Sequence, residues 1–271
     1  MVMQPAQPLR VTVGDIEMAY RVFGQGEPLI LIMGLTGTLD NWDPTLVEEL
    51  ARHYLVIPFD NRGMGASTSA GEYAFEQLAD DTAGLLRALG LEQAHVLGWS
   101  TGGDIALDLA LRHPDRVSRL VLYAGDCGGE EAINPPAEIL AQLSDVAGTP
   151  EEQGRRLLPL LFPAEWLAQN VAYVRRVFVR PMETSTPESM ARQIKAQYEW
   201  PGACSRLAEV KQPTLIVQGM ADLLTPPANA QLLANGIPGS WLARFAGAGH
   251  GLQYQYPRHL AALIRTFLQA P

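Results

Sequence analysis

The pentapeptide Gly98-Trp99-Ser100-Thr101-Gly102 fits the pattern G-x-S-x-G and stands between two different hydrophobic patterns. Residues 94–97 before it form a short apolar run typical of a buried strand, and residues 104–111 after it have the spacing of an amphipathic helix. A serine on so sharp a strand-to-helix turn has its hydroxyl pushed out of the sheet, and the glycines relieve the crowding in the turn. The helix N-terminus offers unpaired N–H groups and the positive end of a dipole, which favour an oxyanion.

Two loops further along the chain supply a carboxylate and an imidazole. Asp222 follows the predicted strand 214–217, and His250 lies in a glycine-rich loop, residues 247–251, after the predicted strand 241–245. A serine hydroxyl is a poor nucleophile at neutral pH and needs a base to remove its proton, a role that suits histidine. A carboxylate on the far ring nitrogen fixes the tautomer and stabilises the imidazolium as it forms. We therefore expect the three side chains to act together.

The order Ser, Asp, His is that of the α/β-hydrolases, and the chain resembles this superfamily over nearly its whole length. The stretch 60–67, Asp-Asn-Arg-Gly-Met-Gly-Ala-Ser, is similar to the loop after the fourth strand of the family. The resemblance implies that Ser100 is the nucleophile, His250 the base and Asp222 the acid. Asp126 is an alternative acid, because some family members place the carboxylate after the sixth strand. The Gly-x-x-Asp loop and the chain order favour Asp222.

The oxyanion hole is expected after the first buried strand, residues 28–33. A His-Gly pair usually stands here in the family, and the resemblance implies that the backbone N–H groups of Leu35 and Thr101 donate to the oxyanion. Met33 replaces the usual histidine in this chain. Because the donors are backbone amides, we expect them to be present despite the replacement of the histidine by Met33. The replacement should instead affect how the loop is anchored.

The identity of the nucleophile limits the chemistry. Haloalkane dehalogenases and soluble epoxide hydrolases share the fold but use an aspartate, whereas position 100 is serine. Serine with two amide donors suits a tetrahedral oxyanion and therefore acyl transfer. We expect a carboxylesterase-like serine hydrolase that cleaves small to medium carboxylic esters through an acyl-enzyme intermediate. The alternatives are hydrolysis of lactones, thioesters, amides or C–C bonds, cofactor-free perhydrolysis as in haloperoxidase-like relatives, and a slow-turnover ligand receptor on the same fold.

The hydrophobic patterns predict the architecture. Strands 9–13 and 16–23 form an opening hairpin, followed by strands 29–33, 55–59, 94–97 and 117–123 that alternate with helices 44–51, 75–89 and 103–112. Strands 214–217 and 241–245 and helices 228–235 and 257–269 complete the pattern. The alternation predicts an α/β fold with a mostly parallel eight-stranded sheet and helices on both faces. We expect a hydrolase core of residues 1–126 and 206–271, with a helical cap inserted at residues 127–205.

The predicted cap contains helix starts and many aromatic residues. The stretches 149–152 and 186–188, each Thr-Pro-Glu at the start, have the sequence of helix N-termini. Trp166 and Trp200 in the cap, with Trp99 beside the nucleophile, are candidates to line an acyl pocket. The alternative is packing against the core, because helical spacing of aromatics is mainly a core signal. The cap aromatics concerned are Phe162, Trp166, Tyr173, Phe178, Tyr198 and Trp200.

The composition indicates one catalytic domain that acts on a small molecule. A chain of 271 residues, 47% of them hydrophobic, can bury a large core. The net charge of −9 and the lack of a basic run argue against nucleic-acid and anionic-membrane partners. The first residues lack the pattern of a signal peptide, and no apolar run approaches the length of a membrane span. The oligomeric state and the natural substrate are not fixed by these features.

Cysteine usage and metal-ligand spacing complete the prediction. Cys127 and Cys204 are too few for a disulfide framework. One bridge between them is possible, but we expect free thiols in a cytoplasmic protein. The His, Cys and Asp residues do not show metal-ligand spacing, so the sequence implies neither a metal nor a cofactor.

Overall fold

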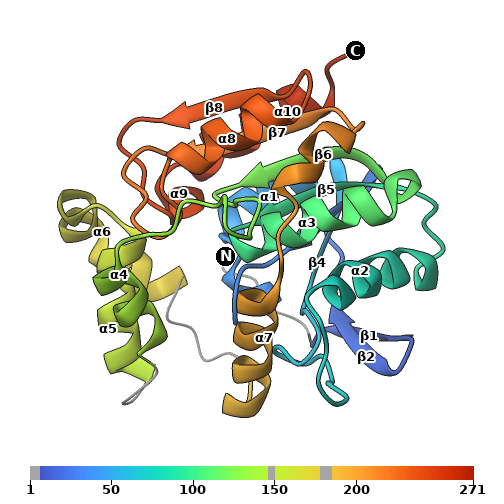
Figure 1. Ribbon diagram of the computed structural model, residues 1–271, viewed down its shortest axis with the longest axis horizontal. Helices are drawn as coiled ribbons and strands as arrows, with labels where there is room; N and C mark the ends of the chain where they lie inside the picture. Colours follow the sequence, from blue (N-terminus) through green and yellow to red (C-terminus); the bar gives the residue numbers. More distant parts are fainter. Residues whose placement is uncertain (1–6, 146–149, 178–184) are drawn as a thin grey trace.

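The computed structural model describes residues 7–145, 150–177 and 185–271, and this part of the chain contains an eight-stranded sheet (Figure 1). The strands are β1 (Leu9–Val13), β2 (Ile16–Tyr20), β3 (Glu27–Ile32), β4 (Tyr54–Phe59), β5 (Ala94–Trp99), β6 (Val117–Tyr123), β7 (Thr214–Gly219) and β8 (Trp241–Phe245). Their order across the sheet is β1-β2-β4-β3-β5-β6-β7-β8. β1 pairs with β2 and β2 with β4 in antiparallel fashion, and the other neighbours are parallel. The predicted α/β-hydrolase fold is confirmed.

Helices cover both faces of the sheet. Along β3, Ile30 and Ile32 belong to a core with α2 (Glu76–Ala88), α3 (Thr101–Arg112) and α8 (Ala228–Gly236). Leu29 and Leu31 face the other way, into a core with α1 (Pro44–Ala51) and α10 (Pro257–Leu268). This alternation is the two-residue period of a strand. Because both faces are covered, every residue of the central strand β5 is buried, as is typical of parallel sheets.

Most predicted elements agree with the structure to within a few residues, and two differences have local causes. β2 ends at Tyr20, and Phe23 forms only an isolated bridge with Val56. The chain turns away at Gly24, where φ is +72° and a Cβ would lie 2.0 Å from the Ala51 carbonyl oxygen. The helix α9 (Leu252–Gln255) has no counterpart in the sequence prediction, because four residues are too few to show a helical period.

The segment between β6 and β7 is helical where the structure describes it. Its helices are α4 (Ala137–Ser144), α5 (Pro150–Leu161), α6 (Ala164–Val177), α7 (Pro187–Glu199) and the 3-10 helix η3 (Cys204–Glu209). In Figure 1, α4, α5 and α6 form one group, whereas α7 stands apart from them. The predicted start at Thr186 is confirmed, since its hydroxyl accepts the Ser189 N–H at 3.1 Å. Thr149 and Phe178 lie outside the described residues, and the proposed division into core and cap stays a prediction.

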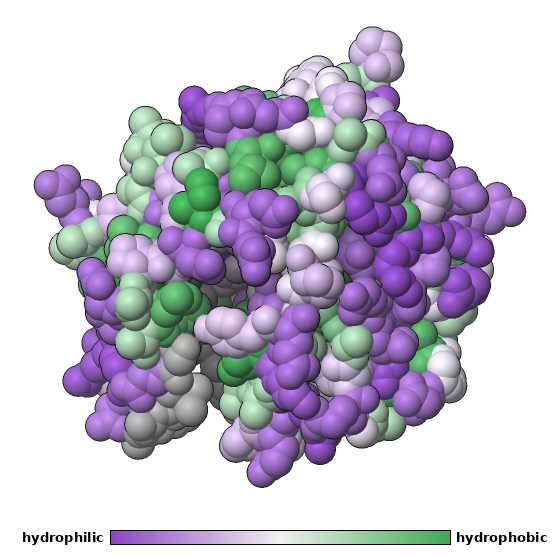
Figure 2. Space-filling model, in the orientation of Figure 1, coloured by the Kyte–Doolittle hydropathy of each residue, from purple (hydrophilic) through white to green (hydrophobic). Residues whose placement is uncertain are grey.

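The helix α7 packs on the sheet domain through a row of side chains one helical turn apart. Ser189 approaches Gly63, Gln193 bonds to the backbone of Thr36, and the Gln197 side-chain amide donates to Asp104 at 3.2 Å. Trp200 follows the helix and is 5% exposed. Hydrophilic side chains lie along α7 on the face seen in Figure 2, as expected for a helix whose other side is buried.

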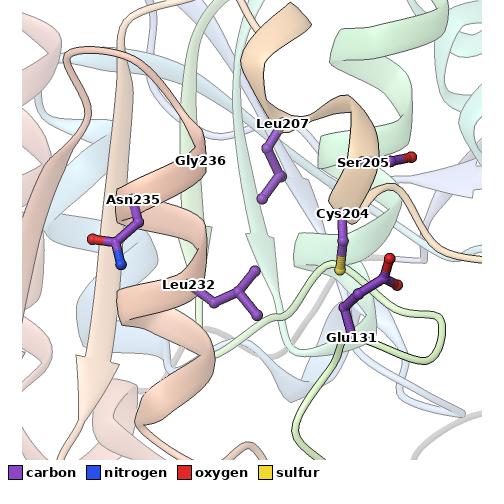
Figure 3. A pocket seen from close by; sticks show the side chains of 7 residues that line it. All are labelled: Glu131, Cys204, Ser205, Leu207, Leu232, Asn235 and Gly236. Carbon is purple, nitrogen blue, oxygen red and sulfur yellow. The ribbon is translucent and has the colours of Figure 1, made fainter.

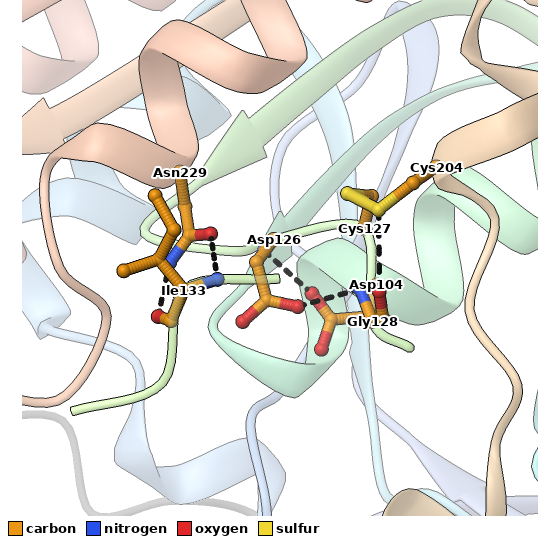
Figure 4. Close-up of a disulfide and its surroundings, with 7 residues drawn as sticks. All are labelled: Asp104, Asp126, Cys127, Gly128, Ile133, Cys204 and Asn229. Atoms are coloured by element: carbon orange, nitrogen blue, oxygen red, sulfur yellow. Dashed lines mark hydrogen bonds between the residues drawn. A yellow bond between two sulfur atoms is a disulfide. The ribbon is translucent and has the colours of Figure 1, made fainter. Parts of the chain in front are cut away.

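The expectation of free thiols was wrong, because Cys127 and Cys204 form a disulfide across 77 positions of sequence (Figure 4). The Ala203 N–H donates to the Cys127 carbonyl at 2.6 Å, so the two chain segments already lie side by side. Cys204 also lines an open pocket of about 360 Å³ between η3 and α8 (Figure 3).

Disulfides persist mainly in oxidising compartments, so the thiol argument for a cytoplasmic location no longer applies. Within the described ranges, no helix is long and apolar enough to cross a membrane.

Candidate active site

Ser100 stands on a strained turn between β5 and α3. Its φ is 57° and its ψ −130°, a backbone conformation that costs a non-glycine residue about 1–3 kcal/mol. The flanking glycines are required by close backbone contacts. A Cβ at Gly98 would lie 2.0 Å from the Gly102 carbonyl oxygen, and one at Gly102 would lie 2.1 Å from the Ile32 carbonyl oxygen. The sharp turn expected from the pentapeptide is therefore present, with α3 beginning directly behind the serine.

Asp222 and His250 are joined by a buried hydrogen bond. The distance from His250 Nδ1 to Asp222 Oδ2 is 2.8 Å, and the two side chains are 4% and 0% exposed. Because a carboxylate accepts hydrogen bonds, Nδ1 carries the proton and Nε2 is left as an acceptor. The carboxylate also accepts the N–H groups of Leu224 and Thr225, both at 2.9 Å, and the Gln218 side-chain amide at 3.2 Å. These bonds offset the cost of burying the charge.

The alternative acid, Asp126, is held in a different network. Its carboxylate accepts the Gly128 N–H at 2.7 Å, and its own N–H donates to Asp104 at 2.9 Å (Figure 4). Burial, and next the charge of Asp126, raise the pKa of Asp104 well above its usual value, and burial also raises the pKa of Asp126. Among the described residues Asp126 makes no hydrogen bond to His250, which favours Asp222 as its partner.

Tyr123, at the end of β6, connects the serine turn to the histidine loop. Its carbonyl accepts the Ser100 N–H at 2.8 Å, and its hydroxyl donates to the His250 carbonyl at 2.6 Å. The Trp99 indole N–H donates to the same carbonyl at 3.2 Å. The sequence prediction gave Tyr123 no role beyond ending the strand 117–123; the signal that could have found it is that a buried tyrosine hydroxyl needs a hydrogen-bond partner.

Ser100 and His250 lie on neighbouring loops without a hydrogen bond between their side chains in the described part of the chain. The Trp99 and His250 rings have centroids 5.6 Å apart, which places the imidazole beside the residue that precedes the serine. Hydrogen bonds between a nucleophile and its base are often long before substrate binds. The arrangement is therefore compatible with the predicted roles.

The loop after β3 approaches the serine from the other side. A Cβ at Gly34 would lie 3.7 Å from Ser100 Oγ. In the described chain, neither the Leu35 N–H nor the Thr101 N–H donates to another group, so both remain available to an oxyanion. The Thr36 N–H, by contrast, donates to Gln193 Oε1 at 2.6 Å.

Met33, which replaces the family histidine, is 1% exposed, and its carbonyl accepts the Asn61 side-chain amide at 3.1 Å. The loop is thus anchored at both of its ends, by Asn61 and by Gln193. Neither anchor was identified in the sequence, because each bond joins residues far apart in the chain.

The three candidate pocket residues differ in their surroundings. Trp200 stacks on Phe75 with ring centroids 4.5 Å apart, in the core formed with α2 and α3, which favours the packing alternative. Trp99 is 6% exposed and packs among aromatic rings, including Tyr123. Trp166 is half-buried and stacks on Phe162 at 5.0 Å. Since Phe162 borders the histidine loop at Gly251, Trp166 is the candidate whose surroundings best fit a residue that lines the acyl pocket.

Comparisons with known proteins identify the family of this chain. The model of a family described as alpha/beta hydrolase fold matches residues 27–165, and the chain belongs to this family. A putative carbamate hydrolase RutD of Azorhizobium caulinodans is 31% identical over 247 residues, which cover 90% of this chain and 92% of the relative.

Two solved structures are similar to almost the whole chain. A hydrolase from Pseudomonas aeruginosa PA01 has a TM-score of 0.84 and 29% identity, covering 98% of this chain and 100% of that one. The enol-lactonase from Burkholderia xenovorans LB400 has a TM-score of 0.83 and 25% identity, covering 97% and 100%.

Proposed function

We propose that this protein hydrolyses carboxylic esters through an acyl-enzyme formed on Ser100. His250 takes the serine proton as the hydroxyl attacks the carbonyl carbon, and it returns that proton to the leaving alcohol. The N–H groups of Leu35 and Thr101 stabilise the negative oxygen of the tetrahedral intermediate. Water activated by His250 then releases the acid.

The observation that supports this proposal best is the buried bond between His250 and Asp222. The bond leaves Nε2 of the imidazole as the acceptor that a general base requires. The other support is the strained Ser100 turn, because strain of this kind is kept where the surrounding structure enforces it, commonly at active sites.

A carbamate is the second candidate substrate, because the relative from Azorhizobium caulinodans is named a putative carbamate hydrolase. A carbamate ester places nitrogen on the carbonyl carbon, and the same attack and the same oxyanion donors would serve. Nitrogen donates electron density to the carbonyl, so attack on a carbamate is intrinsically slower than attack on an ester.

The test uses a fluorophosphonate label and p-nitrophenyl esters. Ser100→Ala should abolish labelling and reduce ester hydrolysis by about 10³-fold or more, since both need the same oxygen. The matched control is Ser205→Ala, an exposed serine on η3, which should keep both properties. Full labelling of Ser100→Ala would contradict the proposal.

A series of acyl lengths tests the size of the substrate. Each methylene that the pocket buries adds roughly 0.8 kcal/mol, so kcat/KM should rise with length and then fall when the pocket is full. We expect the best substrates among esters of about two to eight acyl carbons. A p-nitrophenyl carbamate of equal size distinguishes the two candidates once each kcat/KM is divided by the rate constant for hydroxide-catalysed hydrolysis of the same compound. After this correction the carbamate should still be the poorer substrate if the protein is an esterase.

A further inference from the structure

Gln193 presents a buried amide group with one half of its hydrogen-bonding capacity unused. The side chain comes from α7 and is fully buried, and its Oε1 accepts the Thr36 N–H at 2.6 Å. A backbone N–H can only donate, so the oxygen must face Thr36 and the NH₂ group must point away from it. Nε2 has no hydrogen-bond partner among the residues that the structure describes.

The amide lies beside the loop that borders the nucleophile. Thr36 follows Leu35, the proposed oxyanion donor, and a Cβ at Gly34 would lie 3.1 Å from the Ser100 Cβ. Leu35, Thr36 and Ser100 each keep partial exposure although their neighbours are largely buried. The loop therefore borders accessible space at the nucleophile, and Gln193 reaches this loop from the side of α7.

An unpaired buried donor has a cost that a bound substrate can remove. Leaving such a group unsatisfied costs about 1–3 kcal/mol. A site with a polar group of this kind favours a substrate that supplies the missing partner and discriminates against an analogue that lacks it. Because Nε2 is a donor, the missing partner is an acceptor atom.

We propose that Gln193 is a specificity-determining residue whose Nε2 donates a hydrogen bond to a second oxygen of the substrate, close to the scissile carbonyl. This inference rests on the proposed ester hydrolysis and narrows its substrate class. The preferred substrates are esters whose acyl part carries an ether or carbonyl oxygen near the reacting carbon. A plain alkyl ester of the same size leaves the donor unpaired.

The test compares two esters of nearly equal shape, p-nitrophenyl methoxyacetate and p-nitrophenyl butyrate. They differ by one oxygen in place of one methylene. Because the ether oxygen also activates the carbonyl, each kcat/KM is divided by the rate constant for hydroxide-catalysed hydrolysis of the same ester. The normalised ratio is the corrected kcat/KM for methoxyacetate divided by the corrected kcat/KM for butyrate. It measures the preference for the ether oxygen that comes from the protein.

Two variants of Gln193 distinguish the role of its acceptor oxygen from the role of its donor nitrogen. Gln193→Met removes both the acceptor for Thr36 and the donor. Gln193→Glu keeps an acceptor for Thr36 and replaces the NH₂ group by an oxygen. The matched control is Gln197→Met, the same exchange one turn later on α7, where the amide donates to Asp104 instead. Circular dichroism and thermal unfolding show which variants are folded.

The wild type should prefer methoxyacetate, and both Gln193 variants should lower the normalised ratio by about tenfold, or about 1.4 kcal/mol. Gln197→Met should leave the ratio unchanged, even if the helix is less stable. Gln193→Glu should retain more butyrate hydrolysis than Gln193→Met, because it keeps the bond to Thr36. Equal ratios in the wild type and both Gln193 variants, with hydrolysis still dependent on Ser100, would overturn this inference alone. Hydrolysis that does not depend on Ser100 would overturn the proposed function and this inference with it.

Discussion

Reduction of the Cys127–Cys204 disulfide should lower the free energy of unfolding by about 4.5 kcal/mol at 25 °C. The bridge joins residues 77 positions apart, so it removes much of the conformational freedom of the unfolded chain. In the chain-entropy model this effect grows with the logarithm of loop length, which gives about 15 cal/mol/K for a loop of this size. The native contacts around the bridge should contribute little to the difference.

The structure explains why the native state should survive reduction. The Ala203 N–H bonds to the Cys127 carbonyl without help from the sulfurs. A Cβ at Gly202 would lie 2.4 Å from the carbonyl carbon of Gly128, so the two segments are in close contact as well. Cys204 lines the open pocket of Figure 3, which gives a small thiol access to the bridge in the folded protein.

The measurement is urea unfolding followed by tryptophan fluorescence, with and without dithiothreitol. The reduced protein should unfold at lower urea concentration, and its denaturant dependence should be steeper because its unfolded state is less compact. The control is the double variant Cys127→Ala with Cys204→Ala, which should not respond to dithiothreitol. An unfolding free energy that changes by less than about 1 kcal/mol on reduction would refute the reasoning. Alkylation of both cysteines in unreduced, denatured protein would also refute it, because only free thiols are alkylated.

Two further predictions concern carboxylates. Asp222→Asn should lower kcat by about 10⁴, as the same exchange does in a serine-protease triad. Asp126→Asn should lower kcat far less. If steady-state assays gave the reverse result, Asp126 would be the acid. Burial raises the pKa of Asp108 from 3.8 to about 6, so the folded protein binds more protons than the unfolded chain between these values, and stability falls as the pH rises through this window. Asp108→Asn should therefore stabilise the protein at pH 8 by on the order of 1–3 kcal/mol and have little effect near pH 4, and equal shifts in urea unfolding at both pH values would contradict this.

The sheet and the serine turn could be predicted because their causes are local. Gly98 and Gly102 are adjacent to the turn that requires them, and the pattern around them changes from strand to helix within a few residues. The pairing of Asp222 with His250 is long-range, yet it was predictable for another reason. Each residue follows a strand of the parallel sheet, and β7 and β8 are neighbours whose carboxyl ends meet at one edge.

The features that could not be predicted depend on where α7 and its flanking segments dock. Gln193 contacts a backbone N–H 157 positions earlier, and nothing in the amphipathic pattern distinguishes it from Gln197 one turn later. Trp200 was a pocket candidate because it is aromatic, but its neighbour Phe75 is fixed only by tertiary packing. The disulfide has the same origin, since two cysteines give no information on whether their segments meet.

Tyr123 has a consequence for how this molecule can move. One residue holds the serine turn through its carbonyl and the histidine loop through its hydroxyl. A displacement of β6 therefore carries both loops in the same direction and leaves their separation nearly constant. Asp222 lies on the loop after β7, and this loop holds the histidine loop through the bond to His250 and through the Ala221 N–H, which donates to the Ala248 carbonyl at 2.8 Å. The histidine loop is therefore held from both β6 and β7, and a shear between these strands would strain both sets of bonds.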